Sequence, residues 1–182
     1  MTTTLHHLSV PTPTTPLTVL LDGDTVVASG FGSAEQLRER LPEPADLVAA
    51  PADHPVGTAL RAWLDGDEGA LDRVEVSQPG TDFQQQVWAA LRAIPAGRTR
   101  SYGEVAAAVG RPGASRAVGS ACARNRLAPF VPCHRVLPAD GATGAYAWGA
   151  DVKRWLLDAE ASPSLMISWY LFFMGVFCLW CF

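Results

Sequence analysis

The chain has 182 residues, a formal net charge of −4 and four cysteines. Its length allows one or two small domains, and the overall negative charge, taken alone, argues against a nucleic-acid-binding protein. The cysteine spacing suggests no disulfide framework and no cleavable signal pattern opens the chain, so we expect an intracellular protein whose thiols stay reduced.

The first 80 residues predict a disordered N-terminus followed by a small α/β domain. Residues 1–16 are rich in Thr and Pro, and we expect them to be disordered. Two apolar, β-branched runs at 17–21 and 25–28 flank Asp22-Gly23, which predicts a hairpin. A capping-box pattern at 33–36 then predicts a short helix to about residue 41.

The remainder of this N-terminal domain, 17–80, contains loops and one further helix. Four prolines between residues 42 and 55 predict loop, and apolar residues at helical spacing over 56–64 predict a helix. A short strand is expected near 71–76, before a linker at 77–80. We expect this small domain to support the next one, since about 80 residues bury too little surface for high stability.

Residues 81–162 predict a mainly helical domain with a helix-turn-helix. Thr81-Asp82 precedes a helix that the Pro-Ala-Gly segment at 95–97 ends. A second capping box at 101–104 starts the next helix, and a Gly-containing turn separates it from a third helix that starts at Ser115 and runs to about Ala123. The third helix carries mostly small side chains, which suit close approach to DNA and close packing on another helix equally well.

The charge is distributed unevenly between the two predicted domains. Residues 1–80 carry 4 Arg or Lys against 12 Asp or Glu, a net of −8, and residues 81–160 carry 10 against 6, a net of +4. A basic second half fits a phosphate-facing surface, although ordinary variation would also produce it.

The segment most informative about chemistry is Val131-Pro132-Cys133-His134-Arg135-Val136. A thiol is a good nucleophile only as the thiolate, and a neighbouring imidazole is the commonest side chain that produces one at neutral pH. Pro132 favours extended backbone before the cysteine, which gives Cys133 a defined direction. The alternative is a buried cysteine beside a chance histidine.

Three blocks around this segment decide between these alternatives. They are FQQQVWAALRAIPAGRTRSYGEVAAAVG, SRAVGSACARNRLAPFVPCHRV and GAYAWGADVKRWLLDAE. Together with the unbroken PCHRV, they resemble the O6-alkylguanine-DNA alkyltransferase family over residues 81–160, and more weakly back to about residue 17. The resemblance implies an α+β fold in which a ribonuclease-H-like N-terminal domain precedes the helical domain with the active-site cysteine loop.

The resemblance also implies the reaction and its catalytic residues. Cys133 would accept the alkyl group from O6-alkylguanine in DNA, and from O4-alkylthymine, once per molecule because a thioether is not readily hydrolysed. His134 would take the thiol proton through a water, and Glu160 would fix the imidazole. Asn125 would tie the third helix to the Cys133 loop, although Arg126 follows it where the family usually has proline. Tyr102 would donate to guanine N3 as the base departs.

Further residues follow from the same resemblance. The substrate pocket would be lined by Tyr102, Cys122, Val136, Tyr146, Ala147 and Trp148, of which Trp148 replaces a glycine of some members and should narrow the pocket. The third helix would enter the minor groove, with Arg116 filling the gap left by the flipped base. The DNA-contacting residues would be Ser115, Arg116, Ala117, Ser120, Ala121 and Arg124.

The expected partner is double-stranded DNA that contains O6-alkylguanine. We expect a monomer that acts in the cytoplasm, at the nucleoid. No cofactor, nucleotide or metal is expected. Residues 163–182 are uncharged and mostly apolar, and they follow the end of the family pattern. This hydrophobic tail is interpreted first as an artefactual extension, then as a membrane anchor, and last as a helix packed on the body. Rival functions are a non-catalytic relative that only binds lesions and a Cys-His-Glu hydrolase.

Overall fold

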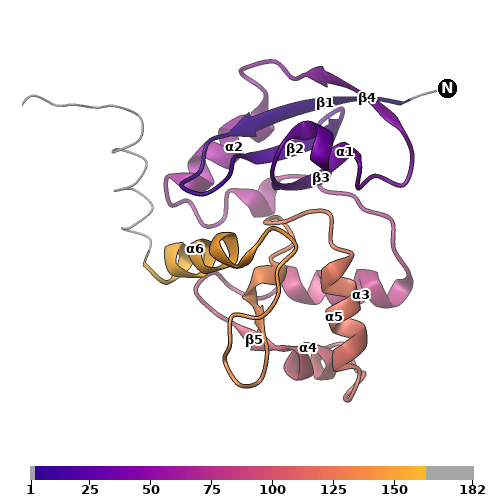
Figure 1. Ribbon diagram of the computed structural model, residues 1–182, viewed down its shortest axis with the longest axis vertical. Coiled ribbons are helices and arrows are strands. Elements are labelled where there is room, and N and C mark those ends of the chain that lie inside the picture. Colours follow the sequence, from indigo (N-terminus) through magenta and orange to yellow (C-terminus); the bar gives the residue numbers. More distant parts are fainter. Residues whose placement is uncertain (1–2, 163–182) are drawn as a thin grey trace, which may run out of the picture.

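A computed structural model describes residues 3–162 of the chain. The N-terminal half forms a four-stranded sheet with helices, and the C-terminal half is a group of helices packed against it (Figure 1). Helix α6 (Ala150–Ala161) lies where the two halves meet. The fold is therefore mixed α+β, as the sequence predicted.

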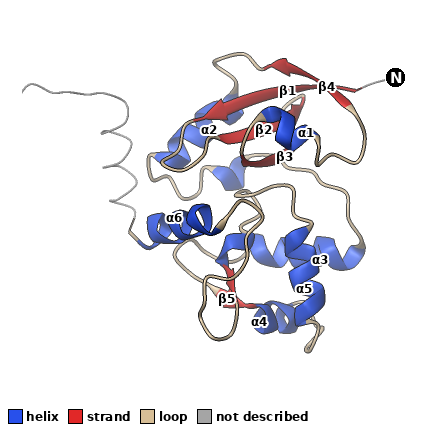
Figure 2. Ribbon diagram, viewed as in Figure 1, coloured by secondary structure: helices blue, strands red, loops and turns tan. Residues whose placement is uncertain are grey.

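The sheet has the order β3-β2-β1-β4 (Figure 2). Strand β1 (Thr3–Val10) pairs antiparallel with β2 (Leu17–Asp22) and parallel with β4 (Ala45–Ala49). The expected disorder of the N-terminus is wrong for residues 3–10, which form an inner strand with a partner on each side. The prolines of residues 1–16 all lie beyond Val10, so they interrupt no hydrogen bond between the strands.

The predicted hairpin is confirmed as β2 and β3 (Thr25–Phe31). Between them Gly23 has φ +59°, a left-handed conformation that glycine adopts at little cost. Along β2, Leu17, Val19 and Leu21 point to one core cluster and Leu20 to the other, so both faces of the strand are covered.

Each face of the sheet is covered by different elements. Helix α1 (Ala34–Arg38), with its capping box at Ser33, packs on one face. Helix α2 (Pro55–Leu64) and the C-terminal half cover the other. The strand expected near 71–76 is instead a 3₁₀ turn, η1 (Leu71–Arg73), followed by a single bridge to β3.

The C-terminal half follows the predicted helix boundaries closely. Its elements are α3 (Asp82–Arg92), β5 (Arg100–Ser101), α4 (Tyr102–Ala108), α5 (Ser115–Ala123), the 3₁₀ turn η2 (Cys133–Arg135), β6 (Val136–Leu137) and α6. Capping boxes at Thr81 and Ser101 start α3 and α4. The α4–α5 turn contains Gly110 and Gly113, both at positive φ.

The main hydrophobic core is continuous across the two halves. Leu17, Leu60, Leu91, Val136 and Leu156, from five different elements, are all fully buried members of it. The N-terminal half thus contacts the elements that carry Cys133 directly. Within residues 3–162 no helix is both long and apolar enough to cross a bilayer, and the predicted hydrophobic tail lies outside the described residues.

Candidate active site

Cys133 begins the η2 turn, directly after Pro132, and its side chain is buried. The Nδ2 atom of Asn125 donates to its Sγ at 3.2 Å and also to the Val131 carbonyl at 2.8 Å. Burial raises the pKa of the Cys133 thiol, while the Asn125 hydrogen bond and the charge of Lys153 act to lower it. Both neighbours therefore favour the thiolate against the effect of burial.

His134 is held by an acid from the far end of α6. Its Nε2 lies 2.9 Å from Oε1 of Glu160, and both side chains are buried. Arg135 donates from Nε and Nη2 to the same carboxylate at 2.8–3.2 Å, and from Nη1 to the Ile94 carbonyl. Burial opposes ionisation of Glu160, but its bonds to His134 and Arg135 dominate and lower its pKa to about 2.

The imidazole of His134 is consequently set up as a neutral base. Burial lowers the pKa of His134, although the Glu160 carboxylate acts to raise it. Because the ionised carboxylate can only accept, Nε2 carries the proton and Nδ1 is left with a free lone pair. Nδ1 has no hydrogen-bond partner among residues 3–162, nor does the buried hydroxyl of Tyr146, whose ring packs edge-on against the imidazole.

Lys153 is a site residue that the sequence analysis did not identify. Its side chain is 1 % exposed, and Nζ donates to the Val136 carbonyl at 2.9 Å. No carboxylate of the described residues forms an ion pair with it. Burial lowers the pKa of Lys153, and the nearby thiols of Cys133 and Cys122 only partly oppose this shift. A signal was present, since Lys153 and Glu160 both occupy the apolar stripe of α6.

Four of the predicted pocket residues lie near this group: Tyr102, Cys122, Val136 and Tyr146. Tyr102 opens α4 and is half-buried against Gly119 of α5; burial raises its pKa, as do the nearby thiols. Burial and the neighbouring Cys133 raise the pKa of Cys122 to about 12. Val136 is fully buried, and Ala147 is exposed.

Trp148 contacts the N-terminal half. The position that a Cβ at Gly30 would occupy lies 1.9 Å from Cζ2 of the Trp148 ring, so the ring fills the space over this glycine. The Arg40 guanidinium stacks on the ring, 4.2 Å from its centroid. Trp148 packs against both core clusters and so joins the 139–149 segment to the sheet. That it narrows the substrate pocket stays a prediction.

Helix α5 presents most of the predicted DNA-contacting residues on one exposed surface. Arg116, Ala117, Ser120 and Arg124 are exposed, and Ser115 is partly so. Ala121 is the exception: its side chain is 1 % exposed and its carbonyl accepts from Trp88 at 3.0 Å, so it is not on this surface. It faces inward because Val118 and Ala121, three residues apart, form the buried side of the helix.

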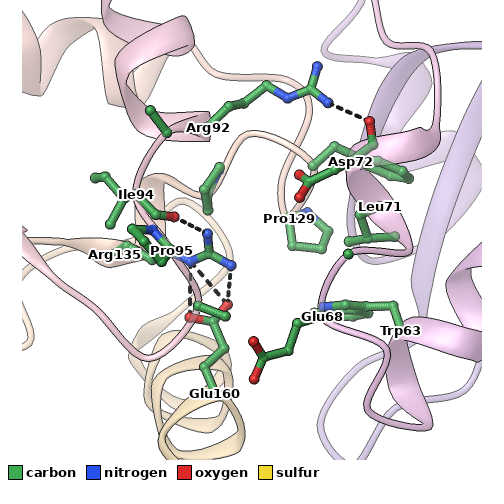
Figure 3. A pocket seen from close by; sticks show the side chains of 15 residues that line it. Trp63, Glu68, Leu71, Asp72, Arg92, Ile94, Pro95, Pro129, Arg135 and Glu160 are labelled. Carbon is green, nitrogen blue, oxygen red and sulfur yellow. Dashed lines mark hydrogen bonds and ion pairs between the residues drawn. The ribbon is translucent and has the colours of Figure 1, made fainter.

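A cavity of about 280 Å³ lies between the two halves, and Arg135 and Glu160 are among the residues that line it (Figure 3). Trp63, Glu68 and Leu71 of the N-terminal half line it, and the carboxylate of Glu68 points into it. Cys133 is not among the lining residues, so this cavity is not where a substrate would meet the thiol. Residues 3–162 contain no group of three His, Cys, Asp or Glu side chains arranged for a metal ion.

The fold and this site define an α+β protein with a candidate cysteine nucleophile beside an exposed helix of small and basic residues. The family model described as "6-O-methylguanine DNA methyltransferase, DNA binding domain" matches residues 82–162. A methylated-DNA–protein-cysteine methyltransferase of Mycobacterium bovis is 42% identical over 163 residues, covering 87% of this chain and 93% of that protein.

Solved structures agree. The structure of Mycobacterium tuberculosis OGT in complex with DNA has a TM-score of 0.74 at 37% identity, covering 90% of this chain and 99% of that one. An O6-methylguanine-DNA methyltransferase from Pyrococcus kodakaraensis has a TM-score of 0.66 at 27% identity, covering 86% of this chain and 98% of that one. The chain belongs to the methylated-DNA–protein-cysteine methyltransferase family.

Proposed function

We propose that the chain repairs DNA by direct reversal, as a single-turnover methylated-DNA–[protein]-cysteine S-methyltransferase that moves the alkyl group from O6-alkylguanine to Cys133. The observation that carries the proposal is the arrangement at the thiol. A buried Cys133 accepts a hydrogen bond from Asn125, and the next residue is a neutral imidazole oriented by Glu160. Family membership supplies the substrate class.

The reaction is an in-line displacement. The thiol proton passes to His134 through a water, and the Cys133 sulfur then attacks the alkyl carbon. A C–S bond forms as the C–O6 bond breaks, and the bonding electrons leave with guanine. His134 accepts the proton at Nδ1, which has no hydrogen-bond partner within residues 3–162, while Glu160 stabilises the imidazolium.

Stabilisation of the departing guanine falls to the pocket residues. We propose that Tyr102 donates to N3, and that backbone groups of Tyr146 and Ala147 reach O6, where charge develops in the transition state. The Val136 carbonyl, with that of Cys133, would hold the exocyclic amine. Because Lys153 already donates to the Val136 carbonyl, this interaction would use the second lone pair of that oxygen.

DNA binding is assigned to α4 and α5, which we propose to be a helix-turn-helix with α5 in the minor groove. Arg116 would enter the base stack in place of the flipped nucleotide and offset part of the few kcal/mol that flipping costs. Its exposed position near the start of α5 supports this role. We also propose O4-alkylthymine as a further substrate.

The division into domains at 17–80 and 81–162 is kept as a proposal, with the strand at residues 3–10 now added to the first. A ribonuclease-H-like assignment for that domain is supported by three antiparallel strands followed by a parallel fourth. We propose that the protein acts as a monomer in the cytoplasm, at the nucleoid.

Intact-mass measurement tests the function. After incubation with duplex DNA containing O6-methylguanine, we expect one added methyl group per molecule, located on Cys133 by peptide mapping. Cys133→Ala and DNA with unmodified guanine should give no adduct. Tight lesion binding without an adduct would indicate a non-catalytic relative instead, and continuous ester turnover without labelling of Cys133 would indicate a hydrolase.

A further inference from the structure

Gln78 is a buried polar residue in the linker between the two halves, and the chemistry described above does not use it. Its side chain is 8 % exposed, and each end of its amide has a partner. Oε1 accepts from the Arg126 N–H at 2.9 Å, and Nε2 donates to Oδ1 of Asn125 at 3.2 Å. The linker glutamine therefore contacts the residue that contacts the nucleophile.

The amide of Asn125 makes four hydrogen bonds, and each fixes the same orientation. Oδ1 accepts from Gln78 and from the Leu127 N–H at 3.0 Å, and Nδ2 donates to Val131 and to Cys133. Turning the amide over would place its oxygen against the sulfur and its NH₂ against two donors. Gln78 thus helps to keep an N–H, and not a carbonyl oxygen, pointed at Cys133.

The N-terminal sheet in turn holds Gln78 in place. Two backbone hydrogen bonds join Val26 of β3 to the segment just before Gln78. The Val26 N–H donates to the Glu75 carbonyl, and the Val26 carbonyl accepts from the Ser77 N–H, each at 2.9 Å. Ser29 of β3 donates to the Arg126 carbonyl at 2.7 Å. Strand β3 therefore positions the linker and the segment after Asn125 together, and Gln78 bridges the two.

We propose that Gln78 is a positioning residue for the alkyl transfer: it orients Asn125 toward Cys133 and satisfies the buried N–H of Arg126, so that the N-terminal domain sets the reactivity of the thiol. The proposal rests on the proposed role of Cys133 as nucleophile. It assigns the domain interface a part in the chemistry beyond supporting the fold.

Two substitutions separate the two bonds of Gln78. Gln78→Leu removes both. Gln78→Glu retains an acceptor for the Arg126 N–H, but it cannot donate to Asn125 and it faces Oδ1 with a carboxylate. If capping Arg126 were the whole role, Gln78→Glu would behave like the wild-type protein. We expect it to react at least as slowly as Gln78→Leu, because both lose the bond to Asn125.

The measurement is the pH profile of Cys133 alkylation by iodoacetamide, resolved from Cys122 by peptide mass spectrometry. Each variant should lower the rate at pH 7 about fivefold, the effect of one typical hydrogen bond, and shift the profile to higher pH. Gln86→Leu, an exposed glutamine on α3, is the matched control and should match the wild-type profile. Unchanged profiles in both Gln78 variants would overturn the proposal, even if their melting temperatures fell.

If Gln78→Leu fails to fold, Gln78→Leu with Arg126→Pro provides a second variant, since proline has no N–H to leave unsatisfied. Slow labelling in this double variant relative to Arg126→Pro alone supports the link to Asn125, and equal labelling contradicts it. The iodoacetamide assay needs no DNA. A failure of methyl transfer in the wild-type protein would therefore reject the proposed function without affecting the result for Gln78.

Discussion

His134 Nε2 lies 2.9 Å from Oε1 of Glu160, and this contact joins the middle of the η2 turn to the last turn of α6. Neither side chain is open to solvent, and Arg135 occupies both oxygens of the carboxylate. The acid therefore has two tasks, orienting the base and neutralising a partly buried guanidinium.

Replacing Glu160 by Gln should impair both tasks. The uncharged amide leaves Arg135 without its counter-charge, and breaking a buried pair in this way costs about 3–5 kcal/mol. We expect urea unfolding at pH 7 to show a loss of this order and methyl transfer to slow by at least about tenfold. Glu104→Gln, at an exposed capping box, is the control. A Glu160→Gln protein with wild-type transfer rate would exclude the acid from catalysis.

Stability should fall in acid in two stages. An unfolded histidine takes up a proton below pH 6.5, whereas burial lowers the pKa of His134 in the fold, so stability begins to decline there. The pKa of Glu160 is lowered from 4.5 to about 2, so its contribution of about 3 kcal/mol is complete above pH 4.5 and is lost as the pH falls toward 2.

Urea titrations between pH 7 and pH 3 check this assignment. Below pH 4.5 the free energy of unfolding of the wild-type protein should fall more steeply than that of Glu160→Gln. Parallel curves would mean that another carboxylate controls acid unfolding.

Lys153→Met should separate reactivity from stability. The variant keeps the packing of the side chain and removes a buried charge, but the Val136 carbonyl loses its hydrogen bond from Nζ. We therefore expect the free energy of unfolding to fall by no more than about 3 kcal/mol. The Cys133 thiolate loses its nearby positive charge, so the pKa of the thiol should rise and iodoacetamide labelling at pH 7 should slow. Arg154→Met, at an exposed position, is the control; equal labelling in the two variants would refute an electrostatic role for Lys153.

Gly30→Ala should displace Trp148. A methyl group at residue 30 would overlap the indole ring, which is too rigid to yield locally, so the 139–149 segment must move and methyl transfer should slow. Adding Trp148→Gly should restore part of the rate by removing the clash. If the double variant is as slow as Gly30→Ala alone, the ring is not the cause.

The same Trp148→Gly substitution tests the predicted narrowing of the pocket. A ring that narrows the pocket would make the single variant gain more activity toward O6-benzylguanine than toward O6-methylguanine. Equal effects on both substrates would mean that the ring only anchors the 139–149 segment to Gly30 and Arg40.

Local patterns predicted the helices of the C-terminal half well, because capping boxes at Thr81 and Ser101 and glycine turns act within a few residues. They failed for β1 and β4, because β4 pairs with β1 across about 40 residues and β1 lies between β4 and β2. Strand preference depends strongly on such neighbours, so a Thr-rich start and a proline-rich loop were the natural expectations.

The site shows the same limit. Cys133, His134 and Asn125 lie within one short stretch, and the family resemblance drew attention to them. Gln78 gave no comparable signal, because a polar linker residue is usually solvated. Arg135 belongs to the PCHRV segment, but no role could be assigned to it without its partners. Their importance depends on partners 47 and 25 residues away. Ala121 was misplaced because a run of small residues does not by itself reveal which side of a helix faces inward.

The continuous core described above makes the two halves of this protein depend on each other for stability. Leu17 of the sheet and Leu156 of α6 belong to one apolar cluster. Either half expressed alone would therefore expose a large hydrophobic surface to solvent. Replacing the N-terminal half by that of a distant relative would therefore require compensating substitutions in the C-terminal residues of this shared core. We expect the two halves to unfold together in a single cooperative step.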